Sequence, residues 1–315
     1  MSTQLQRLNS ALSGAVSQQN ASPQLPIIFV IGAPRSGTTL MHQWLTSLGC
    51  FAYASNLASR FYSNPYVGGL AHRALLEEPE SRVLKPELTA NFQSVLGKTT
   101  GPHAPNEFWH FWRECFHIHG NDVSAINKDL LVENKLFEKG LAGLEEAFER
   151  PLALKGLILN WHLAELASLL PSSHFIFVSR NTADNAYSLY QAREKFFSTA
   201  SEWYSFQYPG YAALKNLEPE EQVVRQVQDN NAAISDGLRH LATERVTTIS
   251  YEAFCDDPSN LYARIREVLG PLGSVLSVEY RGPECFERRT SSRSGATYRN
   301  IKDISSRHAG GQSDL

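Results

Sequence analysis

The clearest hydrophobic pattern begins just after Pro26. The apolar segment 27–31 is rich in β-branched residues, which predicts a buried strand, and the polar turn 32–37 follows it. Residues 38–49 predict a helix that ends at Gly49, a residue preferred after helix C-termini. The apolar positions at helical spacing in this segment are Leu40, Met41, Trp44, Leu45 and Leu48. The start of the ordered chain therefore reads as strand, loop and helix.

The same alternation continues toward the C-terminus. Short apolar segments predict strands at 151–156, 174–179 and 246–250. Apolar residues at helical spacing predict helices near 126–149, 161–170, 182–197, 219–241 and 259–270. Strands that alternate with helices form a parallel sheet covered by helices on both faces, so the pattern predicts an α/β fold of three layers.

The chain divides into one domain and two polar ends. Residues 1–24 are rich in Gln, Ser, Asn and Ala and predict a flexible leader, with a weak helical pattern at 3–13. Residues 25–300 are expected to form the single domain. Aromatic-rich insertions near 50–125 and 198–216 are expected to cap the functional edge of its sheet and to form part of a ligand site there, and 301–315 is expected to be a flexible tail.

Composition narrows the class of protein. The 315 residues are 42% hydrophobic and 19% charged, which is typical of a globular protein. The net charge is −3 and no run of basic residues occurs, so a nucleic-acid partner is not expected. The four cysteines lack the spacing of a zinc site. No apolar run is long enough to cross a bilayer or serve as a signal peptide, so a cytoplasmic protein is expected.

The first chemical motif is IGAPRSGTTL at 31–40. Gly32 and Gly37 have the spacing of a phosphate-binding loop, in which backbone amides and a helix N-terminus surround an anion. Thr38 stands where nucleotidases carry Lys, the cation has moved into the loop as Arg35, and Thr39 keeps the hydroxyl. The predicted fold is therefore P-loop-like, with an altered loop.

This loop resembles the 5′-phosphosulfate loop of sulfotransferases that use 3′-phosphoadenosine 5′-phosphosulfate (PAPS). The Arg form, PRSGTT, resembles the tyrosylprotein branch and the bacterial carbohydrate and lipid branches. The resemblance implies that Arg35, Ser36, Gly37, Thr38 and Thr39 bind the phosphosulfate group, and that Arg35 also stabilises charge during transfer.

A second motif spans 175–193 and resembles the 3′-phosphate signature of the same family. It places Arg180 at the end of a strand and Ser188 eight residues later. The resemblance implies that both bind the nucleotide 3′-phosphate. Thr182 stands where the family usually has Pro, and Arg193 lies one residue out of register with a further phosphate-binding Arg.

Other segments add nucleotide and active-site candidates. The segment 247–258 resembles a third family motif, which implies a nucleotide contact from Tyr251. Lys155 resembles the Lys at a strand end in the family and is a candidate active-site residue. The segment 287–300 is expected to supply phosphate contacts, with Arg293 as a candidate.

An alcohol acceptor requires a general base. The stretch 50–62, where the tyrosylprotein branch has its Glu, contains no carboxylate, which argues against that activity. The segment 101–112 resembles a block of bacterial relatives and offers Glu107 and His103, between which the sequence does not choose.

Acceptor contacts are expected at the carboxyl edge of the sheet, where ligands of parallel sheets bind. Asn56 and Arg60 lie just after the first helix and are the candidates. The implied function is transfer of a sulfuryl group from PAPS, the co-substrate, to a hydroxyl of a carbohydrate, glycolipid or small metabolite, without a metal. Two alternatives stay open: a P-loop kinase or nucleotidase that uses ATP and Mg²⁺, and a catalytically inactive nucleotide-binding module.

Overall fold

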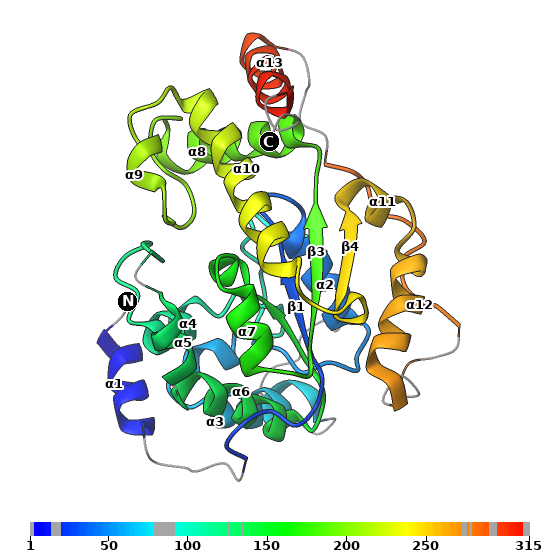
Figure 1. Ribbon diagram of the computed structural model, residues 1–315. Helices are drawn as coiled ribbons and strands as arrows, with labels where there is room; N and C mark the ends of the chain where they lie inside the picture. Colours follow the sequence, from blue (N-terminus) through cyan, green and yellow to red (C-terminus); the bar gives the residue numbers. More distant parts are fainter. Residues whose placement is uncertain are drawn as a thin grey trace.

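The centre of the protein is a four-stranded parallel sheet (Figure 1). The structure, a computed structural model, describes residues 3–13, 20–78, 92–124, 126–133, 135–271, 276, 279–289 and 295–310. The strands are β1 (Ile27–Ile31), β2 (Leu152–Lys155), β3 (Ser173–Ser179) and β4 (Val246–Ser250), in the order β2-β1-β3-β4. In register, Phe29 pairs with Leu154 and Phe175, and Phe177 pairs with Thr248. All four strands predicted from the sequence are confirmed.

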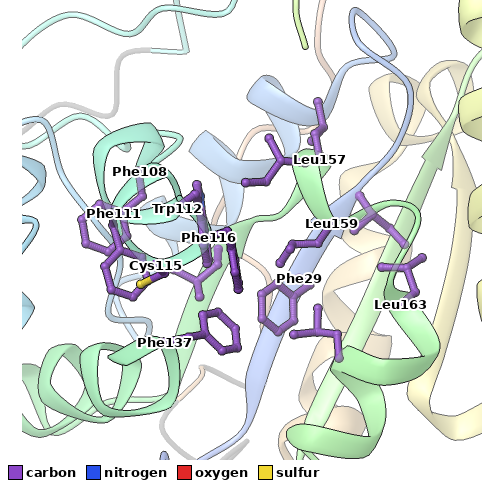
Figure 2. Close-up of a cluster of buried hydrophobic side chains, with 14 of the residues drawn as sticks. Phe29, Phe108, Phe111, Trp112, Cys115, Phe116, Phe137, Leu157, Leu159 and Leu163 are labelled. Carbon is purple, nitrogen blue, oxygen red and sulfur yellow. The ribbon is translucent and has the colours of Figure 1, made fainter. Parts of the chain in front are cut away.

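Alternating side chains of the sheet enter two separate cores, because successive residues of a strand point to opposite faces. Ile28 and Val30 pack against one set of helices, and Phe29 packs in the other cluster. Figure 2 shows Phe29 together with the aromatic side chains of that cluster, among them Phe116 and Phe137. Both faces of the sheet are therefore covered, which confirms the three-layer α/β fold.

Each face has its own helices. The core of Ile28 and Val30 includes α2 (Thr38–Ser47), α11 (Tyr251–Asp256) and α12 (Pro258–Leu269). The core of Phe29 includes α4 (Trp109–Phe116), α5 (Lys128–Glu133), α6 (Lys135–Phe148) and α7 (Leu163–Leu169). Three further helices pack on one another near the carboxyl ends of β1 and β3: α8 (Thr182–Phe197), α10 (Pro219–Leu238) and α13 (Ala296–Gly310) (Figure 1).

Shorter elements complete the chain. They are α1 (Thr3–Leu12), the 3-10 turn η1 (Ala58–Phe61), α3 (Pro65–His72), the π-helical turn η2 (Arg73–Glu77), η3 (Leu157–Leu159), α9 (Tyr211–Leu214) and η4 (Thr243–Arg245). Among the helices that the structure describes, none combines the length and hydrophobicity needed to cross a membrane.

The two ends of the chain differ from the expected flexible leader and tail. Within the leader, α1 is fixed by Asn9, which donates to the Arg60 carbonyl (2.8 Å) and accepts from the Ser63 amide (3.0 Å). The expected tail from 301 is instead largely helix, because α13 buries Ile301 and Ile304 against α8 and α10. The sequence pattern missed this helix because its apolar positions are few.

Candidate active site

The loop 32–37 connects β1 to α2 in a conformation that its glycines permit. A Cβ on Gly32 would lie 2.6 Å from the Val178 carbonyl oxygen, and one on Gly37 would lie 2.4 Å from the Tyr251 ring. Gly37 also has φ 107°, and Arg35 takes φ 70°, which is uncommon for a residue with a side chain. The sheet and the Tyr251 ring therefore hold the loop tightly, and this strain is typical of functional sites.

The N-terminus of α2 opens from this loop. The first backbone amides of a helix, here those of Thr38, Thr39 and Leu40, have no acceptor within the helix. The N-cap residue is Gly37, which offers no side-chain oxygen, and the first turn contains no acidic residue. These amides and the positive end of the helix dipole are thus available to an anion.

The Arg180 side chain lies next to Arg35 of the loop. Arg180, at the end of β3, donates to the Arg35 carbonyl (3.0 Å) and the Arg289 carbonyl (2.8 Å) and stacks over the Tyr251 ring at 4.6 Å. The Nε atoms of Arg35 and Arg180 are buried and have no hydrogen-bond partner in the described part of the chain. Burial lowers the pKa of Arg35, and the nearby Arg180 and Arg289 lower it further. Both arginines line the cavity described below, where their charges favour an anion.

Glu107 and Lys155 form an ion pair next to the loop. The Lys155 ammonium donates to Glu107 Oε1 and to the Thr39 hydroxyl (2.8 Å), and Trp109 Nε1 donates to Glu107 Oε2 (2.8 Å). Burial by itself would raise the pKa of Glu107, but the Lys155 ammonium and the hydrogen bonds from Lys155 and Trp109 outweigh it and lower the pKa. Glu107 is therefore an ionised carboxylate at neutral pH.

One cavity of about 1180 Å³ connects these groups. Most of the residues predicted from the sequence line it: Arg35, Gly37, Thr38, Thr39, Asn56, Arg60, Glu107, Arg180, Ser188 and Tyr251. Lys155 and Arg289 line it as well. Ser188, two turns along α8, and Arg180, before that helix, reach the same cavity, as the 3′-phosphate motif requires.

Three predicted residues lie outside this lining. Ser36 is fully buried, and its amide donates to the Ala33 carbonyl (3.1 Å) within the turn, so neither its hydroxyl nor its amide faces the cavity. His103 is turned away as well, and its carbonyl accepts from the Tyr53 hydroxyl (2.9 Å). Of the two candidate bases, only Glu107 lines the cavity.

Arg193, the third of these residues, has a structural role. It is completely buried and donates to Gln222 (2.7 Å), Gln226 (3.1 Å) and the Ala200 carbonyl (3.2 Å). Burial lowers its pKa to about 10. Arg193 therefore lies outside the cavity lining, and its donors link α8 to α10 instead.

The two acceptor candidates differ in what they can contact. The Asn56 amide group donates to the Thr99 and Gly101 carbonyls and accepts from Asn106 (2.7 Å), so it supports the loop 99–106. This full set of partners leaves Asn56 little capacity to bind an acceptor. The exposed Arg60 side chain lines the cavity and remains a candidate.

Sequence reasoning missed several residues of the site. Arg289 lines the cavity, and its amide donates to the Tyr251 hydroxyl (2.9 Å). The basic character of 287–300 was a signal for this contact, but it favoured Arg293, which lies outside the described residues. Tyr204 belongs to the aromatic-rich segment 198–216 that was expected at the functional edge, but the sequence did not single it out or place it beside Arg35.

Comparison with known proteins agrees with this geometry. A model of the sulfotransferase family matches residues 26–271. The fold is similar to the sulfotransferase STF9 from Mycobacterium avium (12% identity, 98% of this chain and 83% of that one, TM-score 0.53). It is also similar to the sulfotransferase STF1 from Mycobacterium tuberculosis (13% identity, 96% and 81%, TM-score 0.53). No curated protein sequence matches significantly. With the family match covering most of the chain and every strand, the protein belongs to the sulfotransferase family.

Proposed function

We propose that the protein transfers the sulfuryl group of PAPS to the hydroxyl group of an acceptor. The observation that carries this proposal is the pair of arginines Arg35 and Arg180, which line one cavity beside the open N-terminus of α2. Two cations next to a helix N-terminus favour a ligand with several anionic groups.

We assign the two charged ends of PAPS to two sets of residues in the cavity. Arg35 and the amides of Thr38 and Thr39 would bind the 5′-phosphosulfate, since helix N-termini favour anions. Arg180 and Ser188 would bind the 3′-phosphate, with Arg289 as an additional cation. The Arg180 guanidinium packs on the face of the Tyr251 ring.

Transfer is an in-line displacement at sulfur. The acceptor oxygen forms a bond to sulfur, the bond from sulfur to the 5′-phosphate oxygen breaks, and adenosine 3′,5′-diphosphate leaves. The hydroxyl proton passes to the Glu107 carboxylate, which is ionised and therefore able to accept it. The Lys155 ammonium, held between Thr39 and Glu107, would stabilise negative charge as it develops.

The kinase alternative makes an opposite prediction. It requires ATP with Mg²⁺, and the P-loop Lys that would bind its phosphates is replaced by Thr38. Calorimetric titration with adenosine 3′,5′-diphosphate and, separately, with ATP and Mg²⁺ distinguishes the two.

We expect the diphosphate to bind, and Arg180→Ala to weaken its binding at least about tenfold, as expected for the loss of a charge-assisted hydrogen bond. The control is Arg239→Ala, at an exposed arginine at the end of α10, which should bind as the wild type does. If ATP with Mg²⁺ binds and adenosine 3′,5′-diphosphate does not, the proposal is refuted.

A further inference from the structure

We infer that the acceptor is an apolar alcohol or phenol rather than a sugar; this inference rests on the proposed function and specifies its second substrate. Besides its charged groups, the cavity has apolar side chains on its wall. Those used in this argument are Leu96, Trp109, Leu157, Phe196, Trp203 and Tyr204.

Contacts with Glu107 and the loop place this lining beside the reacting groups. Trp109 donates to Glu107, and Leu157 follows Lys155 closely in the chain. The turn 95–98 covers the same point, because a Cβ on Gly97 would lie 3.5 Å from both Glu107 Oε1 and Thr39 Oγ1. An acceptor whose hydroxyl reaches Glu107 must therefore lie against these side chains.

The polar atoms of these aromatic residues already have partners within the protein. Trp109 Nε1 donates to Glu107, Trp203 Nε1 donates to the Phe206 carbonyl (3.0 Å), and the Tyr204 hydroxyl donates to the Leu96 carbonyl (2.7 Å). Their rings are thus left to contact the acceptor by apolar surface.

Two polar side chains on the wall, Thr99 and Asn56, are occupied in the same way. The Thr99 hydroxyl donates to the Pro105 carbonyl (2.7 Å), and Asn56 is fully bonded to the loop 99–106. A sugar transferred from water to this surface would lose hydrogen bonds of several hydroxyl groups without replacement, which is costly. An apolar body would instead gain from leaving water.

The cavity wall also exposes apolar side chains to solvent. Six large hydrophobic side chains of the described residues are exposed, and three of them line this cavity: Val95 (60% exposed), Phe196 (51%) and Phe197 (37%). Such a concentration of exposed apolar residues is typical of a binding surface.

Two exposed cations also lie on the wall, Arg60 and Lys98. The Lys98 ammonium lies over the Phe196 ring, 5.2 Å from its centroid, in a cation–π contact. Both side chains can cover an apolar ligand and keep their charges in water.

The test is direct binding, without turnover and without nucleotide. Trp109 and Trp203 line the cavity, so intrinsic tryptophan fluorescence reports occupancy. The ligands are 4-propylphenol and methyl glucoside. The variants are the double substitution Phe196→Ser with Phe197→Ser, and the control Leu70→Ser, at an exposed leucine of α3 outside the cavity.

We expect the phenol to bind at least about tenfold more tightly than the glucoside. The double variant should weaken phenol binding about fivefold, and the control should not change it. Equal or tighter binding of the glucoside, or equal affinities in the double variant and the wild type, would overturn the inference. Because this titration needs no nucleotide, its result is separate from that of the diphosphate titration, whose failure would overturn the proposed function instead.

Discussion

Replacing Glu107 and replacing Lys155 each break the ion pair between them, but the two changes should lower the free energy of unfolding by different amounts. The Lys155 side chain is 5% exposed, whereas the Glu107 side chain is 30% exposed. Glu107→Leu would leave a buried ammonium with the Thr39 hydroxyl as its remaining hydrogen-bond partner among the described residues, so we expect the free energy of unfolding to fall by about 3 kcal/mol. Lys155→Met leaves a carboxylate that is partly hydrated and still bonded to Trp109, and should cost about 1–2 kcal/mol.

The double variant, Glu107→Leu with Lys155→Met, removes both charges together. It should be more stable than the sum of the single effects predicts, with a coupling free energy of about 2 kcal/mol. Urea denaturation of the four proteins gives each free energy of unfolding.

The matched control is the exposed pair Arg239–Asp236, with side chains 67% and 72% exposed. The same cycle there, Asp236→Leu with Arg239→Met, should give a coupling of at most about 0.5 kcal/mol. If the effects at Lys155 and Glu107 simply add within about 0.5 kcal/mol, the two side chains do not interact as described.

Three further substitutions test separate parts of the account. Gly37→Ala adds a methyl group 2.4 Å from the Tyr251 ring at a residue with φ 107°. We therefore expect the free energy of unfolding to fall by about 1–3 kcal/mol and calorimetry to show diphosphate binding at least about tenfold weaker. Unchanged binding would show that the loop tolerates a side chain there. Arg193→Met leaves two buried glutamines without their donor and should lower the free energy of unfolding by about 2–4 kcal/mol while the diphosphate Kd is unchanged; a tenfold weaker Kd would restore a nucleotide role for this residue. Burial lowers the pKa of His42 from 6.5 to about 4, so the neutral ring contributes stability above pH 6.5 that is lost as the pH falls toward 4, by roughly 3 kcal/mol. His42→Gln should flatten that part of the pH dependence in urea denaturation, and an identical pH dependence would contradict the assignment.

The features that the sequence predicted correctly are local ones. A run of buried β-branched residues forms β1, and the loop that follows it carries Gly37 and Arg35 at the start of α2, as the motif predicts. Arg180 lines the cavity because it follows directly after β3, and parallel strands bring their carboxyl ends to one edge. Each of these predictions depends on residues within a few positions of one another.

The features that the sequence did not predict depend on orientation and distant contacts. Ser188 and Arg193 share α8, but five residues correspond to about 140° around a helix, so they face different surroundings. Of Glu107 and His103, only Glu107 lines the cavity, where it pairs with Lys155, which lies 48 residues farther along the chain. Local spacing carries no information on the pairing of Glu107 with Lys155. The loop 99–106, which precedes Glu107, is held by its hydrogen bonds to Asn56, and these are also distant in sequence.

The most direct test of the proposed chemistry is transfer of the sulfuryl group itself. The protein is incubated with PAPS and a panel of phenols, alkyl alcohols and sugars, and mass spectrometry measures sulfated acceptor together with adenosine 3′,5′-diphosphate. We predict equal amounts of the two products, with at least about 100-fold slower formation in Arg35→Ala, because the proposed role of that cation is to stabilise the developing charge. A phosphorylated acceptor formed from ATP and Mg²⁺, with no sulfated product from PAPS, would contradict the account.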